Sequence, residues 1–346
     1  MTAVLKGKEL KAGYAMVVAA VLTLSGGCGT TGNTSKKTAV RPTVVANKPV
    51  LFTVDFQPGQ TLRYRFGSSR KIAIDWDPRA ASGANKVQEQ LEQFEMVVAY
   101  TPVEVDPYGI STIRAVCESA KATRAGGAGR RMSGPDAVES AQGSTFTIKV
   151  DPRGRITDDS ELESLIQEMG QKAFRGGDER RRIKEPDMIG DFVAGQWFLW
   201  DPVSSIEQPA AGVSIGRTWQ SQLSVPTPMV MRRARDVTYR LEEVRRTDNG
   251  RVAVIKSTYT LAKTVPTSWP IPYSGRFQMS GTFGFLGSYE VSGLAGEGQE
   301  LFNIDAGRPE NYQQRYTVEM DASLPPLGIQ ASPRIRIEQT LTMERL

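Results

Sequence analysis

Val237-Thr-Tyr-Arg-Leu-Glu-Glu-Val244 and Arg251-Val-Ala-Val-Ile-Lys-Ser-Thr-Tyr-Thr-Leu261 flank Thr247-Asp-Asn-Gly250 in the second half of the chain. Apolar and polar residues alternate along both runs, which is the period of a strand with one buried face. Asp-Asn-Gly between two such runs is a strong hairpin pattern, because a tight turn needs residues that tolerate a positive φ. This stretch therefore predicts an antiparallel β hairpin.

The same alternation recurs along most of the chain. Leu62, Tyr64 and Phe66 are separated by Arg63 and Arg65, so one face of that segment is apolar and the other is charged. Glycine-containing turns at 106–109 and 151–154 close two further hairpins. Additional strands are expected at 51–56, 71–76, 94–100, 110–117, 145–150, 216–223, 276–285, 312–320 and 334–343.

The middle of the chain has a different pattern. Asp158 and Asp159 precede Ser160 and are interpreted as the start of a helix. The segment 188–200 is almost entirely apolar and fits a second helix, a buried strand or both in sequence, with a helix favoured at its beginning. Apolar residues after Ser160 fall at helical spacing: Leu162, Leu165, Ile166 and Met169.

These patterns predict a mainly β fold of the β-rich α+β class. Each half opens with a small-residue turn and a polar-aromatic strand, and each carries a long hairpin with glycine at its tip, at Gly109 and Gly250. We therefore expect two similar antiparallel sheet units, which can be curved, joined by a partly helical connector. The expected segments are a leader at 1–27, a tether at 28–50, a first unit at 51–159, the connector at 160–205 and a second unit at 206–346.

The N-terminus has the composition of an export signal. Lys6, Lys8 and Lys11 form a positive segment, residues 12–24 are uncharged and mostly apolar, and small residues lead to Cys28. The apolar stretch is short for a membrane-spanning helix, which needs ~20 apolar residues. The order of these segments predicts a secretory signal peptide.

Leu24-Ser-Gly-Gly-Cys28 resembles the lipobox of bacterial lipoproteins, although Ser25 stands where that pattern usually has leucine. The resemblance implies cleavage before Cys28 and acylation of its thiol, whereas the alternative is an ordinary signal peptide with an incidental cysteine. Several acyl chains make attachment stable, because each buried methylene contributes ~0.8 kcal/mol. Gly29 follows the cysteine, and in proteobacterial sorting this favours an outer membrane facing the periplasm, where the organism has one.

The body also resembles a family of bacterial envelope lipoproteins to which no activity is assigned. The segments that carry this resemblance are structural rather than catalytic, so it implies an envelope location and supplies no site residues. They are Gly59-Gln-Thr-Leu-Arg-Tyr64, Val150-Asp-Pro-Arg-Gly-Arg-Ile156, Ile215-Gly-Arg-Thr-Trp219 and Thr238-Tyr-Arg-Leu241.

Several chemistries are disfavoured because the chain has no histidine. Gly212-Val-Ser-Ile-Gly216 matches the nucleophile elbow of hydrolases, but that motif needs a histidine base, so Ser214 is interpreted as a loop residue. Zinc and copper sites are not expected without histidine or paired thiols. Asp75 and Asp77 could offer oxygen to calcium, but no loop with suitable ligand spacing follows. We therefore expect no metal and no cofactor.

Carboxylate-only hydrolysis requires two acids facing one cleft. Asp191 and Asp201 flank an aromatic stretch with Trp197 and Trp200 and are the best pair that the sequence offers. The favoured alternative places the tryptophans in the core and the aspartates in caps or turns. Cys117 lies in an alternating strand and is interpreted as a small buried hydrophobe without a disulfide partner.

The charge balance argues against a nucleic-acid partner. The net charge is +5, and residues 1–27 contribute three lysines and one glutamate, which leaves +3 for the remainder. Basic runs at 180–184 and 232–235 are interpreted as solvated faces that could also touch anionic headgroups. We expect a non-catalytic envelope lipoprotein that binds or scaffolds an envelope protein. A carrier of a hydrophobic ligand or lipid is the main alternative, and a carboxylate-based hydrolase is the second.

Overall fold

The structure is a computed structural model of the chain. It describes residues 48–78, 87–126, 135–174, 182–183, 187–228, 232–266, 269–273, 277–279, 281–286, 288–324 and 332–346. Residues 42–346 form one compact unit. The expected signal peptide, Cys28 and the tether up to residue 47 lie outside the described residues.

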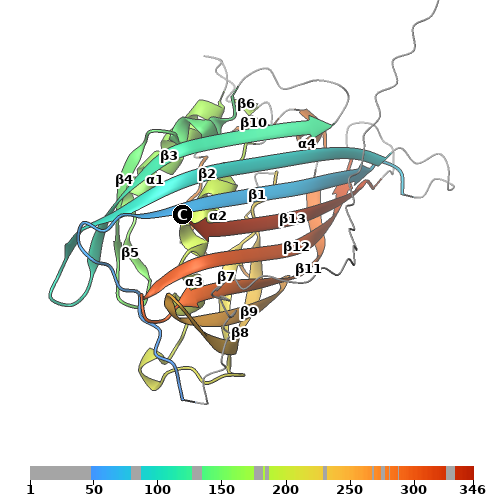
Figure 1. Cartoon of the computed structure of the whole chain (residues 1–346). Coiled ribbons are helices and arrows are strands. Elements are labelled where there is room, and N and C mark those ends of the chain that lie inside the picture. Colours follow the sequence, from blue (N-terminus) through green and yellow to red (C-terminus); the bar gives the residue numbers. More distant parts are fainter. Residues whose placement is uncertain are drawn as a thin grey trace, which may run out of the picture. The chain divides into compact units, whose positions relative to one another are not determined.

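The body is built on one curved antiparallel sheet of eleven strands, shown in Figure 1. The strand order is β5-β4-β3-β2-β1-β13-β12-β11-β9-β8-β7. The bounds are β1 (Leu62–Asp75), β2 (Val87–Val105), β3 (Ser111–Gly126), β4 (Thr145–Val150), β5 (Ile156–Asp158), β7 (Thr218–Ser224), β8 (Ala234–Thr247), β9 (Gly250–Leu261), β11 (Ser288–Asn303), β12 (Arg308–Ser323) and β13 (Arg334–Arg345).

The mainly β class is confirmed, and the two halves of the chain meet within a single sheet. β1 pairs with β13 along its length, from Tyr64 opposite Arg345 to Asp75 opposite Arg334. Residues before the connector therefore form one side of the sheet and residues after it form the other. The hairpin expected at 247–250 is present as the β8–β9 turn, where Gly250 has a positive φ of 108°.

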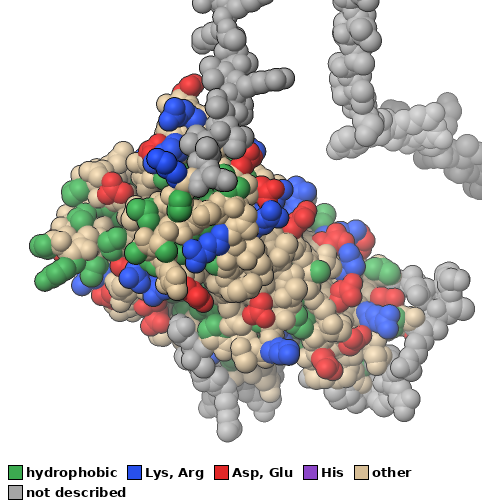
Figure 2. Space-filling view, turned by 90° about the horizontal axis from the view of Figure 1, so that it is seen from below, with side chains coloured by type: hydrophobic (Ala, Val, Ile, Leu, Met, Phe, Trp, Pro, Cys, Tyr) green, Lys and Arg blue, Asp and Glu red, His purple; other side chains and the backbone are tan. Residues whose placement is uncertain are grey.

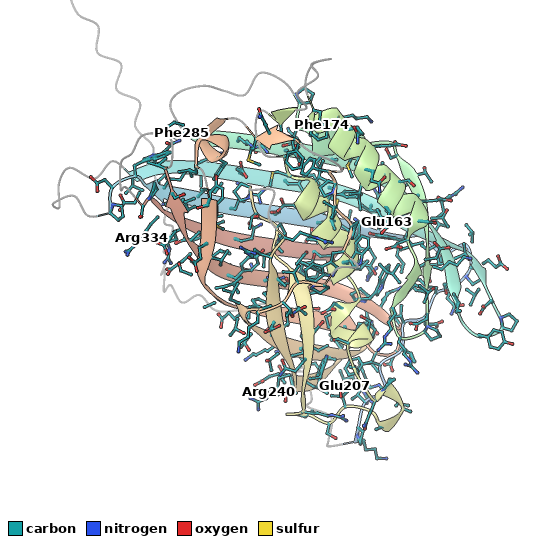
Figure 3. All side chains as sticks on the ribbon, turned by 180° about the vertical axis from the view of Figure 1, so that it is seen from behind. Glu163, Phe174, Glu207, Arg240, Phe285 and Arg334 are labelled. Carbon is teal, nitrogen blue, oxygen red and sulfur yellow. The ribbon has the colours of Figure 1, made fainter. Side chains whose placement is uncertain are left out.

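Helices cover the inner face of the sheet (Figure 3). The expected helices are confirmed as α1 (Ser160–Ala173) and α2 (Ile189–Phe198), which are followed by the single turn α3 (Asp201–Ser204) and, later, α4 (Gly281–Phe285). Short 3₁₀ turns occupy Ala137–Ala141 (η1) and Pro209–Ala211 (η2). Among the described residues, no helix is long and apolar enough to cross a membrane.

The core fills the space between α2 and the inner face. Phe192 of α2 contacts Phe146 of β4 with ring centroids 6.4 Å apart, and Phe198 is also fully buried. The outer face instead carries cross-strand ion pairs such as Arg63–Glu118 and Arg336–Glu319. Figure 2 shows the mixture of both charges on one side of the body. Each exposed pair contributes only ~0–1 kcal/mol, so the buried inner face holds the fold together.

Two strand predictions are wrong. In the described part of 276–285, the two-residue strand β10 (Gln278–Met279) pairs with β6 (Arg182–Ile183) and is followed by helix α4. Gly284 lets helix α4 pack against the end of β10, because a Cβ at this position would lie only 2.0 Å from the carbonyl oxygen of Met279. The segment 51–56 is not a sheet strand but an extended run, attached through Val54 N–H to the Pro152 carbonyl at 2.8 Å.

Candidate functional site

A half-open, mainly apolar pocket lies beside the start of α2 and is called the α2 pocket below. Its cavity volume is about 130 Å³. Two proline-containing segments, 224–228 and 269–273, face α2 across it. Its apolar lining residues include Val193, Val225, Pro226, Trp269, Ile271 and Pro272.

One helical glycine allows the 269–273 segment to approach its helix, and a second helical glycine lines the pocket. A Cβ on Gly170 of α1 would lie 1.6 Å from the carbonyl oxygen of Pro272, so only glycine lets this segment rest on the helix. Gly190 of α2 lines the pocket opposite Pro226, and a Cβ there would make an ordinary contact at 3.8 Å. The first glycine therefore positions a wall, and the second leaves the volume open.

Asp187 and Tyr273 are two of the polar residues that line the α2 pocket. The Tyr273 hydroxyl donates to Oδ2 of Asp187, and the backbone N–H of Ile189 donates to Oδ1 at 3.0 Å. Burial raises the pKa of Asp187 to about 6, although the Tyr273 hydrogen bond opposes this shift. Tyr273 also packs against Phe174, with ring centroids 6.0 Å apart. Both polar groups thus already have partners within the protein.

The rim of the α2 pocket is basic. Nη2 of Arg232, just before β8, donates to the Trp269 carbonyl at 2.6 Å and so attaches the 269–273 segment to the start of that strand. Arg232 is exposed and Arg233 is partly exposed. Asp187 is the one acidic residue among the described residues that line the pocket. An anionic group at this rim would therefore meet two guanidinium groups and one carboxylate that is already hydrogen bonded.

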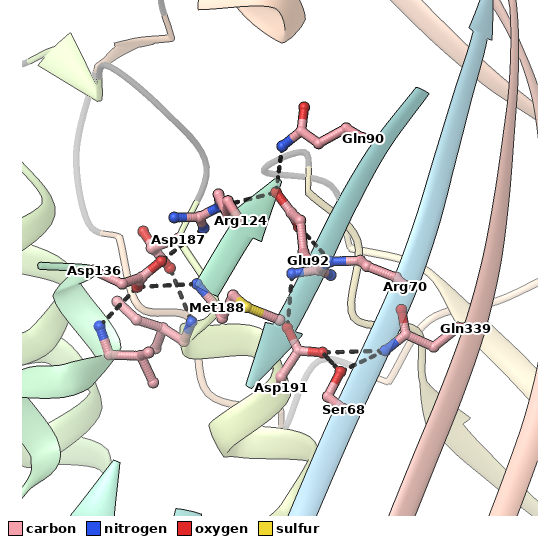
Figure 4. A network of polar contacts seen from close by, with 12 residues as sticks. Ser68, Arg70, Gln90, Glu92, Arg124, Asp136, Asp187, Met188, Asp191 and Gln339 are labelled. Carbon is pink, nitrogen blue, oxygen red and sulfur yellow. Dashed lines mark hydrogen bonds and ion pairs between the residues drawn. The ribbon is translucent and has the colours of Figure 1, made fainter. Parts of the chain in front are cut away.

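Behind the pocket lies a buried polar network, the Arg70 network, which Figure 4 shows. It begins at Asp136, whose Oδ1 accepts hydrogen bonds from the N–H groups of Val138 at 2.9 Å and Met188 at 3.3 Å. Asp136 thereby joins the start of η1 to the start of α2. Arg124 pairs with Asp136 at 2.6 Å and with Glu92 at 2.9 Å, which carries the network onto the sheet.

Arg70 is the centre of this network. It pairs with Glu92 at 2.5 Å and with Asp191 at 2.9 Å, and all three side chains are essentially inaccessible to solvent. Asp191 also accepts a hydrogen bond from Ser68 at 2.6 Å, and Gln339 donates to Ser68 at 2.7 Å. Burial raises the pKa of Asp191 despite Arg70, whereas Arg70 and Arg124 outweigh burial and lower the pKa of Glu92. The network fixes α2 to the inner face.

A second buried cation, Arg235 of β8, lies among aromatic rings. Its guanidinium is 4.4 Å from the ring centroids of both Tyr259 and Tyr316 and 5.1 Å from that of Phe198. Nη2 donates to Gln314 at 2.5 Å. These cation–π contacts stabilise a desolvated charge under α2. The expectation of a solvated face at 232–235 is therefore wrong for Arg235, while the run at 180–184 lies mostly outside the described residues.

Asp191 and Asp201, the sequence-predicted pair, belong to separate clusters, the first buried and the second half-buried. Asp191 is held by Arg70 near β1, whereas Asp201 accepts hydrogen bonds from Ser221 at 2.9 Å and Tyr239 at 2.7 Å near β7 and β8. Neither lines the α2 pocket. Trp200 is buried in the core, as the alternative interpretation predicted.

The other candidate residues from the sequence lie in turns or at the start of a helix. Ser214 is exposed in the turn before β7, where its carbonyl accepts the Arg217 N–H. Asp75 accepts the backbone N–H of Asp77 at 3.2 Å. Asp158 accepts the N–H of Ser160 at 3.2 Å at the start of α1, while Asp159 occupies the position before the helix. Within the described residues, no three acidic or cysteine side chains gather as a metal-ligand group.

Cys117 is fully buried in β3, which agrees with its interpretation as a small hydrophobe. Burial raises the pKa of its thiol to about 12, so the nucleophilic thiolate is disfavoured at neutral pH.

Asp201 allows the effect of burial on a carboxyl pKa to be tested through the pH dependence of stability. Burial raises its pKa to about 6, against hydrogen bonds from Tyr239 and Ser221 that lower it. A carboxyl whose folded pKa is raised stabilises the fold below its unfolded pKa, and this stability is lost as the pH rises through the folded pKa. Asp201→Asn should therefore gain stability relative to the parent by roughly 2 kcal/mol between pH 4.5 and pH 7.5.

Urea unfolding of both proteins at the two pH values measures this difference. An equal stability difference between Asp201→Asn and the parent at both pH values would contradict a raised pKa.

The Arg70 network was missed from the sequence, but the strand pattern contained a usable indication. Ser68 and Arg70 fall at the same parity as Phe66 and Ile72, so they point to the buried face. Glu92 similarly shares the parity of Phe94. A charge at a buried parity position predicts a buried ion pair, because an unpaired charge there would be too costly.

Comparison with known protein families finds no family model that matches the chain, and comparison with curated proteins finds no matching sequence.

Proposed function

We propose that this chain is a non-catalytic envelope lipoprotein, anchored by lipid on Cys28, whose folded body binds a partner. The observation that carries the binding role is the α2 pocket, a half-open, mainly apolar cavity in which the Asp187 and Tyr273 side chains are already hydrogen bonded to each other. An apolar pocket with few polar groups is the usual form of a binding site. The sequence of residues 1–28 supports the anchor.

The size of the α2 pocket favours a protein partner over a carried lipid. A dry cavity of about 150 Å³ holds one benzene molecule. The α2 pocket, at about 130 Å³, is suited to one side chain, and a membrane lipid's acyl chain is several times longer. The concavity of the sheet, where a carrier would hold its ligand, is occupied by α2 and the buried rings of Phe192 and Phe198.

The pocket geometry also supports binding better than hydrolysis. Carboxylate-only hydrolysis uses a pair of acids on one cleft. Among the described residues of the pocket wall, Asp187 is the one acid. Its two carboxylate oxygens accept hydrogen bonds from the Tyr273 hydroxyl and the Ile189 N–H.

Cys28→Ser should move the protein from the membrane fraction to the soluble fraction, because the acyl chains supply the attachment free energy. Cys117→Ala is the matched control and should remain with the membrane, since that thiol is buried in the core. Intact-mass measurement of the parent should show an acylated N-terminus at Cys28. Membrane retention of Cys28→Ser equal to that of the parent would overturn the anchor.

Affinity capture of the membrane-attached protein, followed by mass spectrometry of proteins and lipids, tests the binding role. Enrichment of a defined envelope protein over a Gly190→Leu pocket variant supports the proposal. Recovery of a stoichiometric lipid instead would favour the carrier.

A further inference from the structure

We infer that the α2 pocket takes one aromatic or branched aliphatic side chain of a partner protein, with a carboxylate of that partner at the Arg232–Arg233 rim. This inference rests on the proposed binding role and names the chemistry of the partner. It is independent of the lipid on Cys28.

The volume sets the apolar group. About 130 Å³ is close to the size of cavity that holds a benzene ring, and the wall offers Trp269, Pro226 and Val193 as contact surface. Residues that fill such pockets contribute most of the free energy at protein interfaces. A single inserted side chain therefore fits the pocket better than a flat contact does.

The pocket is held open by the fold rather than by a ligand. Gly170 seats Pro272 on α1, and Arg232 fixes the Trp269 carbonyl, so both ends of the 269–273 wall are attached. Asp136 and Asp187 cap the N–H groups of Met188 and Ile189 and so fix the start of α2 on the other side. A preformed pocket loses little conformational entropy when a side chain enters.

The charge at the rim selects the neighbouring group. Arg232 and Arg233 stand at the mouth, while Asp187, the acidic group in the described wall, lies inside and is engaged by Tyr273. A carboxylate beside the inserted side chain can receive charge-assisted hydrogen bonds from the guanidinium groups. Arginine is suited to this role because its planar donors match carboxylate geometry.

The first experiment uses 3-phenylpropanoate as the probe and 3-phenylpropanol as its uncharged analogue. Binding to the purified full chain in detergent is followed by saturation-transfer NMR at low ionic strength. The propanoate should bind roughly five- to tenfold more tightly than the alcohol, and added salt should reduce the difference. Equal binding of both compounds, or binding of neither, would overturn the inference.

Variants then place the probe. Gly190→Leu should abolish binding, because its Cβ fits at 3.8 Å from Pro226 while the rest of the side chain fills the pocket. Arg233→Gln should remove the preference for the propanoate while leaving binding of the alcohol unchanged. Arg240→Gln, at an exposed arginine elsewhere on β8, is the matched control and should bind like the parent. Unchanged binding by Arg233→Gln overturns the assigned rim even where Gly190→Leu does not fold.

The last experiment identifies the occupant. A photo-reactive phenylalanine at Ile271, which is 42% exposed at the pocket, should cross-link to a partner peptide in which an apolar residue neighbours an acidic one. Excess 3-phenylpropanoate should suppress the cross-link. Cross-linking to lipid, or to a protein without competition by the probe, would overturn the inference. Since these measurements do not depend on Cys28, their failure is distinct from failure of the anchor.

Discussion

Arg70→Met should lower the free energy of unfolding by about 3–5 kcal/mol, because it leaves two carboxylates buried without their cation. Glu92 and Asp191 both pair with Arg70 and have essentially no contact with solvent. Arg124 can still compensate Glu92, but Asp191 retains only neutral donors, Ser68 and Gln339. The loss of stability should therefore be largest at neutral pH. There Asp191 must either stay charged and unpaired in the core or bind a proton at a free-energy cost.

Chemical denaturation of Arg70→Met against Arg65→Met measures this effect. Arg65 lies on the same strand, and its ion pairs with Glu95 and Glu344 are exposed, so its loss should cost ~0–1 kcal/mol. The triple variant Arg70→Met, Glu92→Gln, Asp191→Asn should recover much of the lost stability, because it removes the stranded charges. A loss from Arg70→Met no larger than that from Arg65→Met would show that the network contributes little.

Gly296→Ala should lower the free energy of unfolding by about 2–3 kcal/mol, because β11 has no space for a side chain at this position. A Cβ there would lie 2.2 Å from the carbonyl oxygen of Arg315 and 2.4 Å from the Cβ of Tyr316. An added side chain at Gly296 should also disturb the surroundings of Arg235. Gly296 pairs with both Tyr259 and Tyr316, whose rings lie against the Arg235 guanidinium.

Gly293→Ala on the same strand is the matched control for Gly296→Ala. The nearest neighbour of a Cβ at Gly293 is 3.8 Å away, which is an ordinary contact. This control should change stability by less than about 0.5 kcal/mol. Thermal or urea unfolding compares the two variants, and equal losses would mean that any alanine in β11 is destabilising, whatever its surroundings.

Alternation in the sequence predicted most of the sheet, because each strand buries one face on the core. It did not predict β11, where Gly293, Gly296 and Gly298 interrupt the pattern and resemble a loop. Gly296 and Gly298 are in the sheet because neighbouring strands fill the space of their missing side chains: a Cβ on Gly298 would lie 2.1 Å from the Tyr259 hydroxyl oxygen. Local sequence cannot show that compensation, since Tyr259 lies on a different strand.

The α2 pocket was also beyond sequence analysis. Its walls come from α2 and from two proline-containing segments that are distant from it along the chain, and their approach depends on Gly170. The aspartates that the sequence suggested, Asp191 and Asp201, lie in separate clusters, whereas the carboxylate among the described pocket residues is that of Asp187. The sequence could have indicated buried charges, because Arg70 and Glu92 alternate in step with the apolar residues of their strands. That signal points to the Arg70 network and not to the pocket.

The pairing of β1 with β13 places the last strand of the chain in the middle of the sheet. Its hydrogen-bond ladder joins segments from opposite ends of the body, so assembly must wait until the C-terminal residues have emerged. Contacts between such remote segments slow folding, because a very long loop has to close first. The proposed export of this chain would gain from such a delay, since the central ladder cannot form while translocation is incomplete.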